Sequence, residues 1–488
     1  MIYEEVEADE GMKSILNGWR SDKLKVLLLF SWLLTVFFGF FGSTVLLIKI
    51  PGLPALYPFR ILLPITTLIY MIWAIRERRN PWKAASFGQR ICYILCAALI
   101  VYGTISLFRA IDFEFTFTLW ITLCFCLVFF ALALELCSDR QTFVATLWCA
   151  LITTVIHMVM GFIEIFEGGF FTKKFYEVFF FLGDHFTSPS VSAGNPNDYA
   201  MMLVFMLALV LLYWAWRGHK ECFRWIPIVL IAPVYFLLGA TYARLCTISF
   251  WILIAAFSLK AMTSRKLVRQ VLIPALLLLA LTVAFYNYGE DYQRMHPERN
   301  AAVSVEENIT AAAMTENRTQ VAKLTAVVPD QTQTVEKYVQ EAAELLSSSA
   351  VRIELLKHTW NCFTQSKGMG VGLGNTAQLA KPTAESRGGV WGIHCFLARM
   401  MADFGIWFLI PLLLIAFSMV KSGVEIVCRE MKKRNWSGVM TGVMYLSSVL
   451  IYPIASTAPG DAQNSVPMWL FLGCVVLFPR LVRETEEI

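Results

Sequence analysis

Three residues outside the basic links between apolar segments could carry out chemistry, namely Arg244, Arg352 and His394. A histidine exchanges protons near neutral pH, so His394 could take the proton of a hydroxyl group. The guanidinium group is a planar fork of donors that matches phosphate oxygens, so Arg244 could hold an anionic headgroup or a diphosphate, and Arg352 heads an amphipathic helix of the long loop. Each also has a structural interpretation: Arg244 could snorkel to an interface, Arg352 could be a solvated helix charge, and His394 could serve packing alone.

Further motifs surround these candidates. GMGVGLGN (368–375) follows an amphipathic helical pattern at 351–366, and no P-loop Lys-Ser/Thr comes after it, so we expect a tight turn rather than a nucleotide site. Arg399 and Asp403 stand four residues apart, which favours an ion pair within one helix. GNPND (194–198) is a turn signal before a long helix, with Asn197 or Asp198 as the expected N-cap.

The composition indicates the elements that must position these groups. Of 488 residues, 57% are apolar and only 16% are charged. A soluble chain is nearer a quarter charged, so a soluble enzyme, a disordered chain and a nucleic-acid binder are excluded. Most of the 12 cysteines fall in apolar runs, and neither they nor the 6 histidines have metal-ligand spacing. We therefore predict a multi-pass membrane protein with no metal site and no cofactor.

An apolar stretch of about 20 residues crosses the hydrocarbon core as a helix. The sequence predicts an all-α integral membrane protein of about twelve spans, at 24–48, 55–75, 90–108, 115–136, 141–165, 197–216, 224–240, 243–260, 268–288, 392–420, 437–456 and 465–480. The seventh and eighth could form a tight hairpin or one broken passage, because Pro227 and Pro233 make the first half irregular.

The links between spans predict the orientation. Five are basic, at 76–83, 137–141, 217–224, 260–266 and 421–434, whereas those at 108–115, 239–244 and 456–465 hold two basic residues in all. By the positive-inside rule both termini are then cytoplasmic. The expected organisation is a cytoplasmic tail (1–23), helices one to nine (24–288) with an interfacial outer segment near 166–196, a large helical extracytoplasmic loop (289–391) between spans nine and ten, helices ten to twelve (392–480) and a cytoplasmic tail (481–488). Residues 300–350 are expected to be solvated helices or a mobile insert.

Five motifs follow one another between about residues 190 and 410: the GNPND turn, Arg244 after a Tyr-Ala pair, Arg352 at the head of a loop helix, the G-x-G turn at Gly370 and Gly372, and His394 before a span that carries Asp403 with Gly405 nearby. This ordered set resembles the O-antigen ligase and polymerase family, bacterial multi-pass enzymes that move glycans from polyprenyl diphosphate. Cys395 stands where that family usually has Asn.

The resemblance implies a GT-C type architecture and a metal-independent glycosyltransferase. It would move a glycan from a polyprenyl-diphosphate carrier to a hydroxyl of a lipid, glycan or protein acceptor, at the outer face of the bacterial cytoplasmic membrane. Arg244 and Arg352 would bind the diphosphate, and His394 would be the general base. The implied partners are this donor, the acceptor and the bilayer, with no nucleic acid.

Three alternatives remain open from the sequence. Ligase and polymerase differ only in the acceptor, which no motif identifies. A transporter or flippase of a lipid-linked saccharide also suits twelve spans, although we find no half-to-half repeat and the candidate polar residues gather on the outer side. A non-enzymatic assembly or sensor protein could use the long loop as a binding surface.

Overall fold

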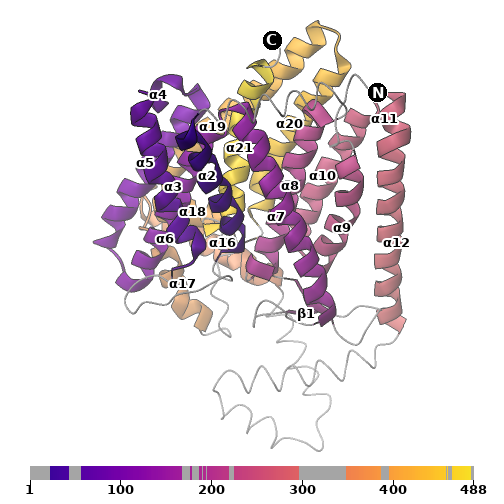
Figure 1. Ribbon diagram of the computed structural model, residues 1–488. Coiled ribbons are helices and arrows are strands. Elements are labelled where there is room, and N and C mark those ends of the chain that lie inside the picture. Colours follow the sequence, from indigo (N-terminus) through magenta and orange to yellow (C-terminus); the bar gives the residue numbers. More distant parts are fainter. Residues whose placement is uncertain are drawn as a thin grey trace, which may run out of the picture.

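The computed structural model of the chain is a bundle of long helices (Figure 1). It describes residues 22–42, 56–167, 176–178, 186–189, 191–193, 195–218, 225–295, 348–385, 395–457, 459 and 464–484. The helices of the first half are α2 (Lys23–Phe41), α3 (Pro58–Arg76), α4 (Pro81–Ala84), α5 (Phe87–Leu107), α6 (Phe113–Leu136), α7 (Arg140–Glu167), α8 (Pro196–Tyr213) and α9 (Ile226–Thr241). Those of the second half are α10 (Arg244–Ala261), α11 (Arg265–Leu267), α12 (Ile273–Met295), α16 (Ser348–Gln365), α17 (Asn375–Glu385), α18 (Phe396–Phe404), α19 (Ile406–Lys432), α20 (Trp436–Ala455) and α21 (Val466–Glu484).

Smaller elements connect the helices. The strands β1 (Tyr176–Val178) and β2 (Phe186–Ser188) pair antiparallel, and the 3-10 turn η1 (Val191–Ala193) precedes α8. Single π-helical turns, η2 (Trp214–Gly218) and η4 (Val268–Leu272), extend α8 and lead into α12.

Eleven helices of the described ranges are long and apolar enough to cross a bilayer. Side chains on their outer surfaces are apolar and exposed, as at Ile75 (77% exposed) and Phe417 (64%), where lipid would cover them. The prediction of an all-α multi-pass membrane protein is therefore confirmed. The seventh expected span is α9, whose 16 residues extend about 24 Å and fall short of a hydrocarbon core of about 30 Å.

The segment around Pro233 is a helical hairpin and not one broken passage. The helices α9 and α10 are joined by Tyr242 and Ala243, and Tyr242 takes the left-handed conformation with φ 53°. Its N–H donates to the carbonyl of Gly239, which closes α9.

Two expectations about local structure are wrong. The tenth span, expected as one helix over 392–420, is divided at Gly405 into α18 and α19. Its second half continues as helix to Lys432, through most of the expected basic link at 421–434. The N-cap of α8 is Asn195, whose side chain accepts from the N–H of Asn197, because Pro196 occupies the first helical position and leaves the cap one residue ahead of it.

Figure 1 shows different connecting elements at the two ends of the bundle. The short helices α4 and α11, in the basic links, lie at the top of the view, and we call this the basic end. Opposite them lie β1 and α17, at what we call the loop end. The expected insert at 300–350 falls almost entirely outside the described residues, and only its last three positions are in α16.

At the centre of the bundle is α8. Every residue from Tyr199 to Tyr213 is buried, and α8 packs against α7, α9, α10, α20 and α21. Phe205 stacks on Phe471 with ring centroids 4.3 Å apart and also faces Tyr452 of α20. A helix apolar all round is expected where neighbours cover every face.

A buried lysine connects α10 to α20 near the basic end. Lys260 is 2% exposed, and its Nζ donates to the carbonyl and hydroxyl of Ser437, both at 2.7 Å, and to the hydroxyl of Thr441 at 2.9 Å. All three acceptors are neutral oxygens, so the ammonium is held by hydrogen bonds across two helices.

Replacing Lys260 by Ala should therefore lower the free energy of unfolding by about 1–3 kcal/mol, since buried acceptors lose their donor. Thermal unfolding in detergent would measure this. Lys266→Ala, at an exposed lysine of the same end, is the matched control and should leave Tm unchanged. Equal Tm values for the two variants would show that the Lys260 contacts contribute no net stability.

Candidate functional site

The helix that carries Arg352, α16, and the helix that follows His394 in the sequence, α18, lie toward the loop end. There α16 packs against α17 and α18, and α18 packs against α19 and α5. The helices α16 and α17 are separated by the segment 366–374, which includes four glycines and which we call the glycine turn.

All four glycines of this turn have positive φ: Gly368 (77°), Gly370 (89°), Gly372 (102°) and Gly374 (78°). Only glycine adopts such angles without steric cost. The expected tight turn is thus present, and it lies against the break between α18 and α19.

Backbone hydrogen bonds join the turn to that break. The N–H of Ile406 donates to the carbonyl of Gly368 (2.9 Å), and the N–H of Val371 donates to the carbonyl of Ala402 (2.9 Å). The N–H of Gly372 donates to the carbonyl of Asp403 (3.0 Å). Groups that a continuous helix would satisfy internally are satisfied here by the turn.

The two backbones approach closely because neither has a side chain at the contact. A Cβ on Gly405 would lie 2.2 Å from the carbonyl oxygen of Gly368, and one on Gly370 would lie 2.5 Å from that of Asp403. Gly405 also has φ +60°. The break therefore requires glycine on both sides of the contact.

Asp403 fastens the start of α17 to α18. It is 1% exposed and accepts from the N–H of Gly374 (3.0 Å) and from the N–H (3.2 Å) and hydroxyl of Thr376. Arg399 lies 3.9 Å away, so the pair expected within one helix is present. With four donors pointing at it, Asp403 serves to hold the turn in place.

The turn is also fastened to α5 and the link that follows it. Tyr102 donates its hydroxyl to the carbonyl of Gly370 (2.8 Å). The Asn375 side chain donates to the carbonyl of Arg109 (3.0 Å) and accepts from the N–H of Ile111 (3.1 Å). These contacts join residues more than 260 positions apart in the sequence.

The three predicted site residues lie at different places relative to this assembly. Arg352 is in α16, whose C-terminal end leads into the glycine turn. His394 lies outside the described residues, immediately before Cys395, the N-cap of α18. Arg244 is the exposed first residue of α10, at the end of that helix away from α11, and α10 packs against α8 and α20. The structure thus joins α16 to α18, and it brings Arg244 to the loop end on a separate group of helices.

Sequence reasoning missed a second polar cluster toward the loop end. His157 of α7 is fully buried, with Nδ1 2.7 Å from the carbonyl of Thr153 and Nε2 2.7 Å from the hydroxyl of Ser192. Glu164, also buried, accepts from the N–H of Val191 (2.7 Å). The sequence signal that could have revealed this cluster is the presence of two ionisable residues inside one apolar span, because such residues are costly at membrane depth.

Within the ranges that the structure describes, three or more His, Cys, Asp or Glu side chains nowhere gather in a way that could hold a metal ion. His358 and Cys362 of α16 lie 3.5 Å apart, and the His358 ring is 3.2 Å from the carbonyl of Thr376. His358 thereby joins α16 to the start of α17.

Substituting Gly405 by Ala should destabilise the loop end strongly. Positive-φ strain alone costs about 1–3 kcal/mol, and the clash with Gly368 adds to it. The matched control is Gly473→Ala in α21, where a Cβ would meet its nearest atoms at 3.5 Å, an ordinary contact. Thermal unfolding of both variants in detergent checks this, and an unchanged Tm for Gly405→Ala would contradict the described contact.

Comparison with known proteins yields a partial likeness. No protein-family model matches this chain. A stretch of 143 residues is 25% identical to the teichuronic acid biosynthesis protein TuaE of Bacillus subtilis (strain 168). It covers 29% of this chain and 29% of that relative, so the match spans less than a third of either protein.

Proposed function

We propose that this chain is a membrane glycosyltransferase of polysaccharide biosynthesis. It moves a glycan from a polyprenyl-diphosphate carrier to a hydroxyl acceptor, as an O-antigen ligase-like enzyme or a polysaccharide polymerase, and it has a GT-C type architecture. The partial similarity to a teichuronic acid biosynthesis protein supports the broader assignment to polysaccharide synthesis.

The observation that carries the proposal is the way the loop end is built. Two separate stretches of the chain, one bearing Arg352 and the other following His394, are packed together as α16 and α18. The glycine turn and Asp403 tie these helices together through backbone and side-chain hydrogen bonds. Catalytic groups that must position two substrates need to be held in place by the surrounding structure.

In the proposed reaction, the acceptor hydroxyl oxygen attacks the anomeric carbon of the donor sugar. His394 accepts the hydroxyl proton, and the bond from the anomeric carbon to the diphosphate oxygen breaks. Arg352 and Arg244 hold the diphosphate and stabilise the negative charge that develops on it. Polyprenyl diphosphate leaves, and the glycan is joined to the acceptor oxygen.

The distribution of charge supports an outward-facing site in the cytoplasmic membrane of a bacterium. Basic links gather at the end where α4 and α11 lie, and by the positive-inside rule this end and both termini are cytoplasmic. The loop end then faces outward, where a polyprenyl-linked glycan would present its sugar.

His394→Ala should abolish transfer, because the acceptor loses its base. The assay uses purified protein in lipid with a labelled polyprenyl-diphosphate oligosaccharide and a panel of lipid, glycan and protein acceptors. His296→Ala, which removes another imidazole of the same expected loop, is the control and should keep most of the activity. If the His394 variant transferred glycan at the wild-type rate, His394 would not be the general base.

The same assay separates the alternatives. The acceptor that is used distinguishes ligase from polymerase. If arginines hold the diphosphate, we expect transfer to continue in the presence of a metal chelator. Movement of the labelled lipid between leaflets, without transfer to any acceptor, would replace the proposal by a transporter.

Arg352→Lys keeps the charge but loses the planar fork, so we expect transfer to fall at least about tenfold, equivalent to about 1.4 kcal/mol. Arg269→Lys, at an exposed arginine of the basic end, should leave the rate unchanged. If both variants worked at the wild-type rate, Arg352 would be an ordinary surface charge.

A further inference from the structure

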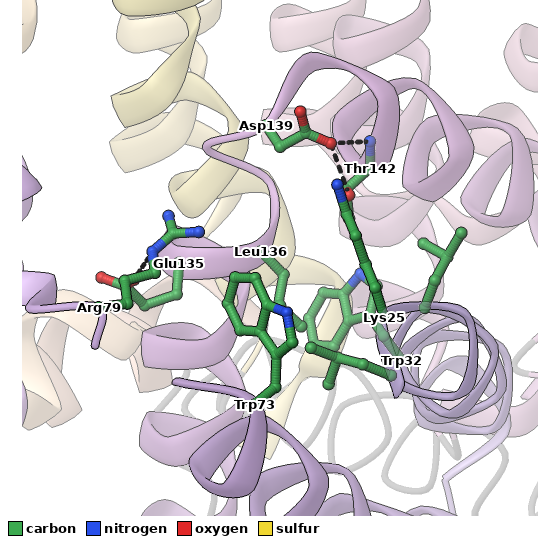
Figure 2. A pocket seen from close by; sticks show the side chains of 10 residues that line it. Lys25, Trp32, Trp73, Arg79, Glu135, Leu136, Asp139 and Thr142 are labelled. Atoms are coloured by element: carbon green, nitrogen blue, oxygen red, sulfur yellow. Dashed lines mark hydrogen bonds and ion pairs between the residues drawn. The ribbon is translucent and has the colours of Figure 1, made fainter. Parts of the chain in front are cut away.

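A cavity of about 150 Å³ lies at the basic end, far from the loop end, between α2, α3, α6 and α7 (Figure 2). Its lining includes Lys25, Trp32, Trp73, Arg79, Glu135 and Asp139. One water molecule takes up about 30 Å³ of liquid, so the cavity has room for a small polar group of several atoms.

Two of the four charged residues in the lining, Arg79 and Glu135, form an ion pair with each other. The Arg79 Nε lies 3.6 Å from a Glu135 oxygen, and its guanidinium lies over the ring of Trp73 at 5.3 Å. Glu135 is 7% exposed and also accepts from the hydroxyls of Tyr70 (3.1 Å) and Tyr93. These residues form a fixed wall with its charges paired.

The other two charged residues retain hydrogen-bonding capacity. Asp139 uses one oxygen, Oδ2, to accept from the N–H (3.0 Å) and hydroxyl (2.9 Å) of Thr142, and its Oδ1 is not engaged by any described residue. The Lys25 ammonium has no hydrogen bond or ion pair with another described residue. Figure 2 shows both side chains extending into the same region.

The cavity lies near the helix ends, at the depth where a lipid headgroup would be expected. Lys25 is in the first turn of α2, Trp73 in the last turn of α3, and Asp139 directly precedes α7, so the lining lies within about 15 Å of the helix ends. Tryptophan and lysine are the side chains that favour the membrane interface. Beside the cavity, exposed apolar side chains continue toward the hydrocarbon, including Leu27 (50% exposed) and Ile72 (50%).

We propose that this cavity binds the headgroup of a membrane phospholipid that carries both a phosphate and a primary ammonium, namely phosphatidylethanolamine. Lys25 donates to the phosphate oxygens, and Asp139 Oδ1 accepts from the ammonium. The acyl chains lie along the exposed apolar surface of α2 and α3. A ligand with both charges suits a cavity that offers one of each sign, and a phosphodiester with a neutral headgroup would leave the carboxylate unmatched.

Native mass spectrometry of the purified, delipidated full-length protein tests the assignment. Phosphatidylethanolamine, phosphatidylglycerol and phosphatidylcholine with identical acyl chains are titrated separately. We expect phosphatidylethanolamine to bind at least fivefold more tightly than the other two, since phosphatidylglycerol has no ammonium and phosphatidylcholine has no N–H donors.

Three variants locate the site. Lys25→Met should weaken phosphatidylethanolamine binding at least fivefold, whereas Lys23→Met, at an exposed lysine of the same turn, should not. Asp139→Asn, which keeps an oxygen for Thr142, should lower phosphatidylethanolamine binding to the level of phosphatidylglycerol. Leu29→Trp fills the cavity without changing a charge and should also reduce binding.

The proposal is overturned if Lys25→Met and Lys23→Met bind all three lipids alike, or if Asp139→Asn retains the wild-type preference. Leu29→Trp keeps the test decisive should a charge variant fail to fold, because full lipid binding with the cavity filled would place the headgroup elsewhere.

Discussion

The constraint on which the rest of the structure depends is that backbone polar groups within a bilayer must find partners inside the protein. Long helices meet it along most of the chain. Where a helix is interrupted, the missing partners come from another segment. The break at Gly405 is the clearest case, because the N–H of Ile406 and the carbonyls of Ala402 and Asp403 find their partners in the glycine turn. Among the described residues, the irregular backbone at this break is thus held by hydrogen bonds to a second segment of the chain.

The same constraint governs the buried polar side chains. Lys260 joins two helices through neutral oxygens, and Asp403 joins two helices and a turn through several donors. Glu135 is held by Arg79 and two tyrosines. Each such group is costly when unpaired, so each fixes the relative position of the elements that supply its partners. These contacts provide the specificity that apolar packing between helices does not, since lipid is as apolar as the helices themselves.

The two ends of the bundle are consequently suited to different tasks. The loop end joins α16, which bears Arg352, to α18, which follows His394 in the sequence, and this fits the proposed chemistry on a diphosphate-linked glycan. The basic end combines paired charges with a small cavity whose Lys25 and Asp139 retain binding capacity. Central α8, buried along its length, runs from the loop end toward the basic end and packs against α7, α9, α10, α20 and α21.

The amino-acid sequence determined the fold class and the positions of the spans, because apolarity over about 20 residues is a local property. It also determined the i to i+4 pair of Arg399 and Asp403 and the need for a turn at 368–375, since both depend on near neighbours. Only the tertiary structure decided where that turn lies, that Gly405 divides a span, and that His157 meets Ser192. Those partners are tens to hundreds of residues apart, and a close approach of two backbones is a property of packing that no window of sequence contains.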